Sequence, residues 1–169
     1  DMPDSGIKDF FDVANTMEGA LSLGVGEPDF PTPEHVREAA IASIKKGDTK
    51  YTDNRGTVEL RAAAADYLTK FDLHYDKQDE ILITMGASEG IDLALRTLVN
   101  PGEEVLVAEP SYVSYIPCIE LCGGVPVSLK LRAENKFRLT REQLEEKITE
   151  KSKVLLISYP NNPTGAIME

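Results

Sequence analysis

Cysteine, tryptophan and long apolar runs are scarce or missing in this sequence. There is no tryptophan, and the two cysteines, Cys118 and Cys122, are too few for a disulfide framework. Their i, i+4 spacing falls in a segment that we expect to be helical, so we interpret them as two partly buried thiols. A redox pair or half of a metal site would need partners, and the histidines, His35 and His74, stand far away along the chain.

Basic residues are also in short supply. The chain has 18 lysines and arginines against 29 aspartates and glutamates, which gives a formal net charge of -11. This balance argues against partners such as nucleic acid or an anionic membrane, because both need a basic face. No run approaches the ~18 apolar residues that cross a bilayer, and residues 1–11 lack the apolar block of a secretory signal. Because the two cysteines form no disulfide framework, we expect a reducing compartment and hence a cytoplasmic protein.

What the sequence does contain is an alternation of short apolar runs and amphipathic helical patterns. Apolar residues make up 41% of the 169 residues, which is ordinary for a globular domain. We expect buried strands at 81–84, 104–108, 125–129 and 153–157. The order strand, helix, strand predicts an α/β fold with a mostly parallel sheet and flanking helices. The last helix should begin at Thr140, which forms a capping box with Gln143.

Two further helices are expected upstream of these strands. The first has Thr32 as its cap, Pro33 at its first position and Gly47 at its end, and one apolar face formed by Val36, Ala40 and Ile44. The second begins near Thr57 and should turn inward Leu60, Ala64, Leu68 and Phe71.

The domain organisation follows from these elements. Residues 1–32 are rich in turn formers and aperiodic, so we interpret them as an N-terminal arm, with residues 33–169 forming part of one domain. The last expected strand runs into 159–165, and no helix follows to cover it. We therefore expect an incomplete sheet that belongs to a fragment of a longer protein.

One motif with chemical potential follows the expected strand at 81–84. Gly86 permits a tight turn, and the backbone N–H groups of Ala87 and Ser88 would then point out of a helix start, which is an anion site and most often holds phosphate. The carboxylate of Glu89 would have to turn away. The same residues also fit an ordinary glycine turn with Ser88 as the helix cap.

Three other segments could place ligand-binding groups at strand ends or in turns. Asn162 follows the last strand and Tyr112 follows the strand at 104–108, where open α/β sheets bind ligands. The amide could donate to a ligand oxygen, and the phenol ring could stack on a flat heterocycle. Gly26 could let the backbone approach a ligand closely. Each also has a plain interpretation, as a turn residue or a half-buried tyrosine.

Taken together and in this order, these segments resemble the class I aminotransferases, which are pyridoxal-phosphate enzymes of fold type I. The resemblance is closest to the prokaryotic aspartate and aromatic aminotransferases, and it extends from Ser22 to Gly165. It rests on Gly-Glu-Pro-Asp-Phe at 26–30, Thr-Pro-Glu-His-Val at 32–36, Lys-Tyr-Thr at 50–52, Glu-Leu-Arg at 59–61, Gly-Ala-Ser-Glu-Gly at 86–90, Pro-Gly-Glu-Glu-Val at 101–105, Pro-Ser-Tyr at 110–112 and Asn-Asn-Pro-Thr-Gly at 161–165.

The resemblance implies a fold and a set of site residues. Residues 33–169 would be the first part of the large cofactor-binding domain. Ala87 and Ser88 would hold the phosphate of pyridoxal 5'-phosphate, Tyr112 would stack on its pyridine ring, and Asn162 would bind its phenolic oxygen and lie near the substrate. No metal is implied.

Two further implied roles concern substrate and partner. Gly26 would lie against the substrate carboxylate, and Tyr51 would reach the cofactor phosphate of a neighbouring subunit, which implies a homodimer. The substrates implied are an amino acid and a 2-oxo acid. The lysine that forms the Schiff base in this family lies beyond the Asn-Pro-Thr-Gly turn, so no catalytic residue is assigned and we expect the isolated chain to be inactive.

Two alternatives to an aminotransferase stay open at this point. The same fold supports carbon–sulfur lyases. It also supports non-catalytic effector-binding domains of transcription regulators, which would need a DNA-binding segment upstream. An unrelated dehydrogenase domain would need the glycine fingerprint for dinucleotides, and Gly24-x-Gly26 lacks its third glycine.

Overall fold

The structure is a computed structural model that describes residues 11–14, 16–19, 21, 26 and 28–168. The chain forms two compact units, residues 3–83 and residues 84–169, which we describe one at a time. The boundary expected from the sequence, between residues 32 and 33, stays a prediction about the longer protein.

The second unit is built on a three-stranded parallel sheet. Strands β1 (Glu104–Glu109), β2 (Val125–Lys130) and β3 (Ser152–Leu156) lie in the order β2-β1-β3, with β1 paired to both neighbours. This confirms the predicted α/β fold and three of the four predicted strands. The chain leaves β1 for β2 on one side and returns to β3 on the other. The carboxyl ends of β1 and β3 therefore form a switch point, which is where open α/β sheets bind ligands.

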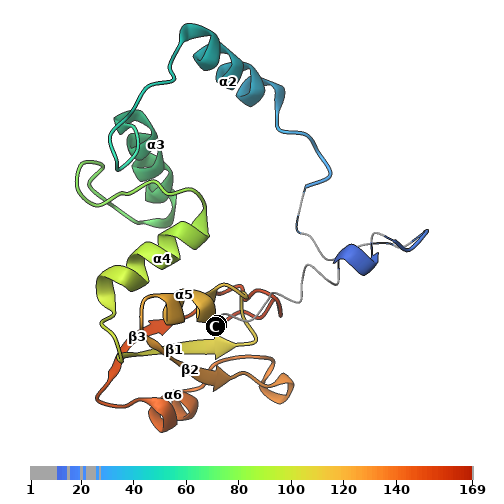
Figure 1. Cartoon of the computed structure of the whole chain (residues 1–169), viewed down its shortest axis with the longest axis vertical. Helices are drawn as coiled ribbons and strands as arrows, with labels where there is room; N and C mark the ends of the chain where they lie inside the picture. The colour runs from blue at the N-terminus through green and yellow to red at the C-terminus, as the bar shows by residue number, and fades with distance from the viewer. Residues whose placement is uncertain (1–10, 15, 20, 22–25, 27, 169) are drawn as a thin grey trace. The chain divides into compact units, whose positions relative to one another are not determined.

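Helices cover both faces of this sheet. The connection from β1 to β2 and the connection from β2 to β3 run in opposite directions across the sheet, and right-handed crossovers then put their helices on opposite faces. Helix α5 (Tyr115–Leu121) and helix α6 (Arg141–Lys147) lie on opposite sides of the sheet (Figure 1). The predicted capping box of α6 is present, since the Thr140 hydroxyl accepts from the Gln143 N–H and the Gln143 side chain accepts from the Thr140 N–H.

The core of this unit lies between β1, α5 and helix α4 (Ala87–Leu98). Val105 and Val107 are fully buried, as the near-continuous apolar run of β1 predicts for a central parallel strand. They form one cluster with Leu95, Val99, Tyr115, Cys118 and Ile119. Cys118 is buried within α5 and Cys122 is half-buried at its end, and both are free thiols, as predicted.

The first unit contains helix α2 (Glu34–Lys46), helix α3 (Val58–Leu68) and the short 3-10 helix η1 (Thr69–Phe71). The Thr57 hydroxyl caps α3 by accepting from the Leu60 N–H, and Gly47 ends α2 in the left-handed region, both as predicted. The predicted start of α2 is wrong by one residue. Pro33 is the cap rather than the first helical residue, and no side chain completes it.

Two other expectations for this unit were wrong. The apolar residues expected to turn inward from the second helix do not all do so in the described chain, because Leu60 and Phe71 are exposed, Ala64 and Leu68 are half-buried, and the buried residue of α3 is Arg61. Residues 81–84 do not form a strand, since no neighbouring strand pairs with them among the described residues. Their backbone bonds instead to a loop, where the Ile83 N–H donates to the Arg55 carbonyl at 3.0 Å.

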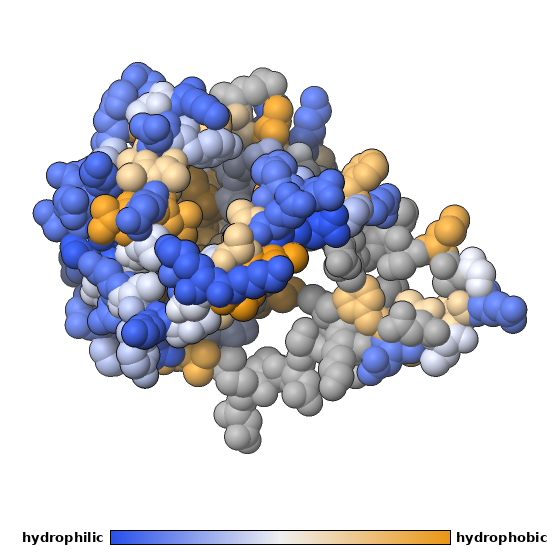
Figure 2. Space-filling model, turned by 90° about the horizontal axis from the view of Figure 1, so that it is seen from above, coloured by the Kyte–Doolittle hydropathy of each residue, from blue (hydrophilic) through white to orange (hydrophobic). Residues whose placement is uncertain are grey.

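Apolar side chains also lie at the surface. Hydrophobic residues appear in orange between hydrophilic ones in Figure 2, and Val36, Ile41, Leu155 and Ile157 are among the exposed ones. In the part of the chain that the structure describes, no helix is both long and apolar enough to span a bilayer.

Candidate functional site

The predicted anion site lies at the start of α4. Gly86 precedes the helix with a φ of 84°, a left-handed conformation that glycine adopts without strain, and the helix begins at Ala87. The backbone N–H groups of Ala87 and Ser88 have no hydrogen-bond acceptor among the described residues. These free donors lie at the positive end of a 12-residue helix, an arrangement suited to an anion.

Ser88 is not the helix cap that the plain interpretation of this motif requires. Gly86 holds the cap position, and no side chain caps the helix. The Ser88 hydroxyl instead lies in the first turn, 3.3 Å from the hydroxyl of Tyr112. A ligand at the helix start therefore has a side-chain hydroxyl next to the free backbone donors.

Glu89 turns away, as an anion site at this position demands. Its carboxylate accepts a hydrogen bond from the Met85 N–H, on the turn that precedes the helix. The same turn is closed by the Thr84 hydroxyl, which donates to the Gly86 carbonyl at 2.9 Å. The negative charge of Glu89 is thus partly satisfied by a backbone donor rather than directed at the free N–H groups.

Tyr112 follows β1 and is half-buried against the core cluster. Its ring packs edge-on against the buried ring of Tyr115, with 5.6 Å between the centroids. The Ser114 hydroxyl and then the Ser88 hydroxyl lower the pKa of Tyr112, because hydrogen bonds to its oxygen stabilise the phenolate. The structure therefore brings Ser88 and Tyr112 together from two elements that are distant in sequence.

The two asparagines after β3 have different surroundings. Asn161 is buried, and its amide nitrogen donates to the Pro110 carbonyl at 3.0 Å and to the Thr164 hydroxyl at 2.9 Å. Asn162, which the sequence singled out, is exposed at the adjacent turn position. The buried amide joins the loop after β3 to the loop after β1, and this leaves the Asn162 amide open to a ligand.

The other predicted residues, Gly26 and Tyr51, belong to the unit of residues 3–83 and are described apart from Ser88, Tyr112 and Asn162. The side chain of Tyr51 is fully exposed and lines a surface pocket with Thr49 and Lys50. Gly26 is exposed, and a Cβ placed on it would meet nothing within 4 Å.

Sequence reasoning missed two residues that support this site and one buried residue in the other unit. Asn161 links the two loops, Tyr115 fixes one edge of the Tyr112 ring, and Arg61 is a fully buried cation in α3. Tyr115 had a signal, since it follows Tyr112 by three residues at the start of a helix. Asn161 and Asn162 are identical neighbours, so their sequence could not indicate which one is buried.

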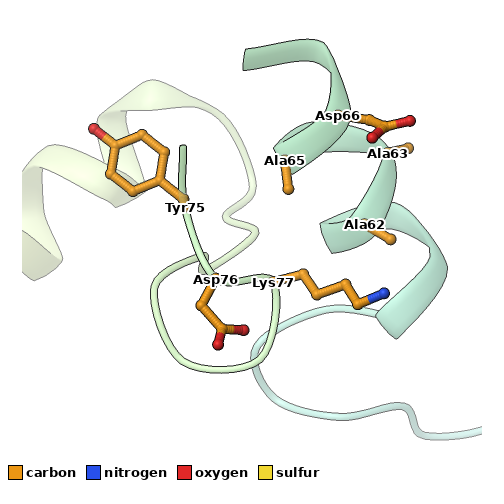
Figure 3. A pocket seen from close by; sticks show the side chains of 7 residues that line it. All are labelled: Ala62, Ala63, Ala65, Asp66, Tyr75, Asp76 and Lys77. Carbon is orange, nitrogen blue, oxygen red and sulfur yellow. The ribbon is translucent and has the colours of Figure 1, made fainter. Parts of the chain in front are cut away.

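A second hollow lies outside the predicted site. It is an open surface pocket between α3 and the loop that follows the helix (Figure 3), lined by Ala62, Ala63, Ala65, Asp66, Tyr75, Asp76 and Lys77. None of the residues predicted from the sequence lines it.

Known proteins match this chain over nearly its whole length. The model of the family "Aminotransferase class I and II" matches residues 18–169. An aromatic-amino-acid aminotransferase from Thermococcus litoralis is 44% identical over 97% of this chain, and an aspartate aminotransferase from Pyrococcus abyssi is 42% identical over 98%. The chain spans about 42% of the length of these curated relatives.

Solved structures agree with the sequence relatives. An aspartate aminotransferase from Rhizobium meliloti superposes with a TM-score of 0.90 at 38% identity, over 99% of this chain and 43% of that one. The N-succinyldiaminopimelate aminotransferase of Mycobacterium tuberculosis gives a TM-score of 0.91 at 34% identity, over 98% of this chain and 44% of that one. This chain therefore belongs to the class I and II aminotransferase family.

Proposed function

We propose that the protein carrying this chain is an amino-acid aminotransferase, which transfers an amino group between an amino acid and a 2-oxo acid. Class I aminotransferases depend on pyridoxal phosphate, and the relatives are named as aspartate and aromatic aminotransferases. The structural observation that carries the proposal is the contact between the Ser88 and Tyr112 hydroxyls, which brings the first turn of α4 next to an aromatic ring. Cytoplasmic residence accords with the two free thiols.

The residues at the start of α4 fit the phosphate of this cofactor. The free N–H groups of Ala87 and Ser88 would donate to its oxygens, with the Ser88 hydroxyl as a further donor. The positive end of the helix favours a dianion. Glu89, the acidic residue of this first turn, is held toward Met85 and does not oppose the phosphate.

The loops at the strand ends fit the ring of the cofactor. Tyr112 presents an aromatic face whose edge is fixed by Tyr115, so the ring can stack on a flat heterocycle without losing further freedom. The exposed amide of Asn162 would donate to the phenolic oxygen, while Asn161 holds its loop in place. When bound, pyridoxal phosphate supplies the electron sink for carbanion chemistry. The residues of this chain bind and orient it.

We also propose that the protein is a homodimer. Tyr51 is fully exposed next to the cation of Lys50, which suits a contact with a phosphate of a neighbouring subunit. The exposed apolar residues of α2, among them Val36, Ile41 and Ile44, offer surface that association would bury.

Gly26 leaves open space at its Cα, so a substrate carboxylate could approach the backbone there.

The test uses the product of the complete reading frame, purified with pyridoxal phosphate. Each amino acid of a panel that includes aspartate and the aromatic amino acids is mixed with 2-oxoglutarate, and glutamate is measured. We expect glutamate to form with at least one of them. Release of ammonia with a thiol and a 2-oxo acid would identify a lyase instead, and cofactor binding without turnover would identify an effector-binding protein.

A pair of variants tests the site itself. Replacing Ser88→Ala should weaken cofactor binding about tenfold, the magnitude of one hydrogen bond to a charged group. Thr97→Ala is the matched control, because this hydroxyl lies on the same helix and donates only to the Leu93 carbonyl. Equal cofactor affinities for the two variants would reject the role of the Ser88 hydroxyl in the phosphate site.

A further inference from the structure

Arg61 is the one residue of α3 that is fully buried, with 0% exposure. Burial of a guanidinium costs several kcal/mol unless its donors are hydrogen-bonded and its charge is paired. A surface position on the same helix would avoid this cost. The buried guanidinium therefore needs hydrogen-bond acceptors and a negative charge around it.

The guanidinium joins the two loops that flank α3. Its Nε donates to the Gly56 carbonyl at 3.2 Å, before the helix, and its Nη1 donates to the carbonyls of Lys77 and Gln78, after it. The loop with Tyr75 and Lys77 runs alongside α3 in Figure 3. Arg61 thus fixes the start of the helix to the loop that follows it.

The remaining nitrogen of Arg61 faces an acid. Among the described residues, Nη2 has no hydrogen-bond partner, but it lies 3.6 Å from Oδ2 of Asp53 and forms an ion pair with it. Arg55 binds the same carboxylate, with its Nη2 3.0 Å from Oδ2 and its backbone N–H 2.8 Å from Oδ1. The Asp53 carboxylate therefore lies between two guanidinium groups.

These contacts determine the course of the segment that carries Tyr51. Asp53 follows Tyr51 by two residues, and its carbonyl accepts from the Gly56 N–H at 2.9 Å. Arg55 fixes the next turn by donating to the Gln78 carbonyl at 2.7 Å. The Tyr51 side chain is itself fully exposed, so its direction depends on the backbone from which it projects.

We propose that Arg61, acting through Asp53, is a positioning residue that holds the segment of Tyr51 so that the phenol is presented to the cofactor phosphate. The inference rests on the proposed role of Tyr51. Arg61 touches neither cofactor nor substrate in this account. Its function is to remove the freedom of the segment before binding, so that less conformational entropy is lost when the phosphate is bound.

A double-mutant cycle tests this, with the cofactor-free product of the complete reading frame titrated with pyridoxal phosphate. Asp53→Asn keeps the shape of a half-exposed side chain, and Tyr51→Phe removes only the phenol oxygen. We expect each to weaken binding, Tyr51→Phe about tenfold, and the double variant to be no weaker than Tyr51→Phe alone. Asp79→Asn is the control, since this 83%-exposed carboxylate also pairs with Arg55 but not with Arg61.

A second measurement separates positioning from general stability. In Asp53→Asn, amide hydrogen exchange should quicken in residues 51–57 and stay unchanged in β1. Arg61→Lys, which cannot make the forked contacts, should reproduce this pattern if it folds. Asp53→Asn alone decides the question if Arg61→Lys does not fold.

Three results would overturn the inference. They are additive effects of Asp53→Asn and Tyr51→Phe, an unchanged cofactor affinity in Asp53→Asn, and exchange that quickens throughout the chain, β1 included. If Tyr51→Phe alone leaves affinity unchanged, the role of Tyr51 fails and the inference fails with it. The aminotransferase proposal is judged separately by glutamate formation, so the two failures are distinguishable.

Discussion

The amide nitrogen of Asn161 donates a hydrogen bond to the Pro110 carbonyl, 3.0 Å away across 51 residues of sequence. This single bond joins the loop after β3 to the loop after β1. The first loop carries Asn162, and the second carries Tyr112. Asn161 therefore fixes the loop of Tyr112 relative to the loop of Asn162, the two residues that we assign to the cofactor ring, and it need not touch the cofactor itself.

Removal of this link should cost stability. Asn161→Ala removes a buried amide that donates to the Pro110 carbonyl and the Thr164 hydroxyl, and we expect the free energy of unfolding to fall by about 1–3 kcal/mol. Chemical denaturation of the two proteins measures it. Asn162→Ala is the matched control, because the exposed neighbour should change stability by less than about 0.5 kcal/mol while weakening cofactor binding. Equal stabilities for both variants would contradict the assignment.

Tyr112 should ionise below the pH at which a free tyrosine does. The hydroxyls of Ser114 and Ser88 lower its pKa by stabilising the phenolate, with Ser114 the larger contribution. In the cofactor-free protein, subtraction of the alkaline ultraviolet titration of Tyr112→Phe isolates this ionisation. We expect Ser114→Ala to move it to higher pH more than Ser88→Ala does. A titration that neither substitution moves would show that these hydrogen bonds do not act on the phenolate.

The part of this architecture that the sequence predicts is the part with local causes. The hydroxyl of Thr140 and the amide of Gln143 cap α6 because both groups are within reach of one helix turn. The apolar run of β1 predicts a central strand because both of its faces are covered. Gly86 indicates a turn before α4 because glycine adopts a positive φ, which this turn requires, without strain.

The features that the sequence does not predict depend on distant partners. Residues 81–84 have the apolar pattern of a strand, but a ladder needs a neighbouring strand, which the described sheet does not supply. The sequence predicts a surface position for Arg61 in α3. Its burial cannot be predicted locally because it depends on the carbonyls of Gly56, Lys77 and Gln78. Which of Asn161 and Asn162 is buried depends on Pro110, far away in the chain.

Gly56 should not tolerate a side chain. Its φ is 94°, and a Cβ there would lie 2.6 Å from Cγ1 of Ile83, so Gly56→Ala combines backbone strain with a steric clash. We expect it to lower the free energy of unfolding by about 2–4 kcal/mol, the sum of a left-handed penalty and overpacking. Gly47→Ala is the control, since it has a φ of 85° and open space, and should cost only about 1–2 kcal/mol. If both variants cost the same, Ile83 does not confine this turn.

The stability of the first unit should depend on acid through Asp53. Hydrogen bonds from the Arg55 side chain, and then from its backbone N–H, lower the pKa of Asp53 from 3.8 to about 2. Because the pKa is lower in the folded state than in the unfolded state, the ionised Asp53 carboxylate stabilises the folded state fully above about pH 4. This stabilisation is lost as the pH falls through about 2. The difference in free energy of unfolding between the unsubstituted protein and Asp53→Asn should therefore shrink from pH 5 to pH 2. Urea denaturation at several pH values measures it, with Asp79→Asn as the variant that should keep the full acid dependence. A difference that stays constant down to pH 2 would mean that Arg55 does not hold the Asp53 carboxylate in solution.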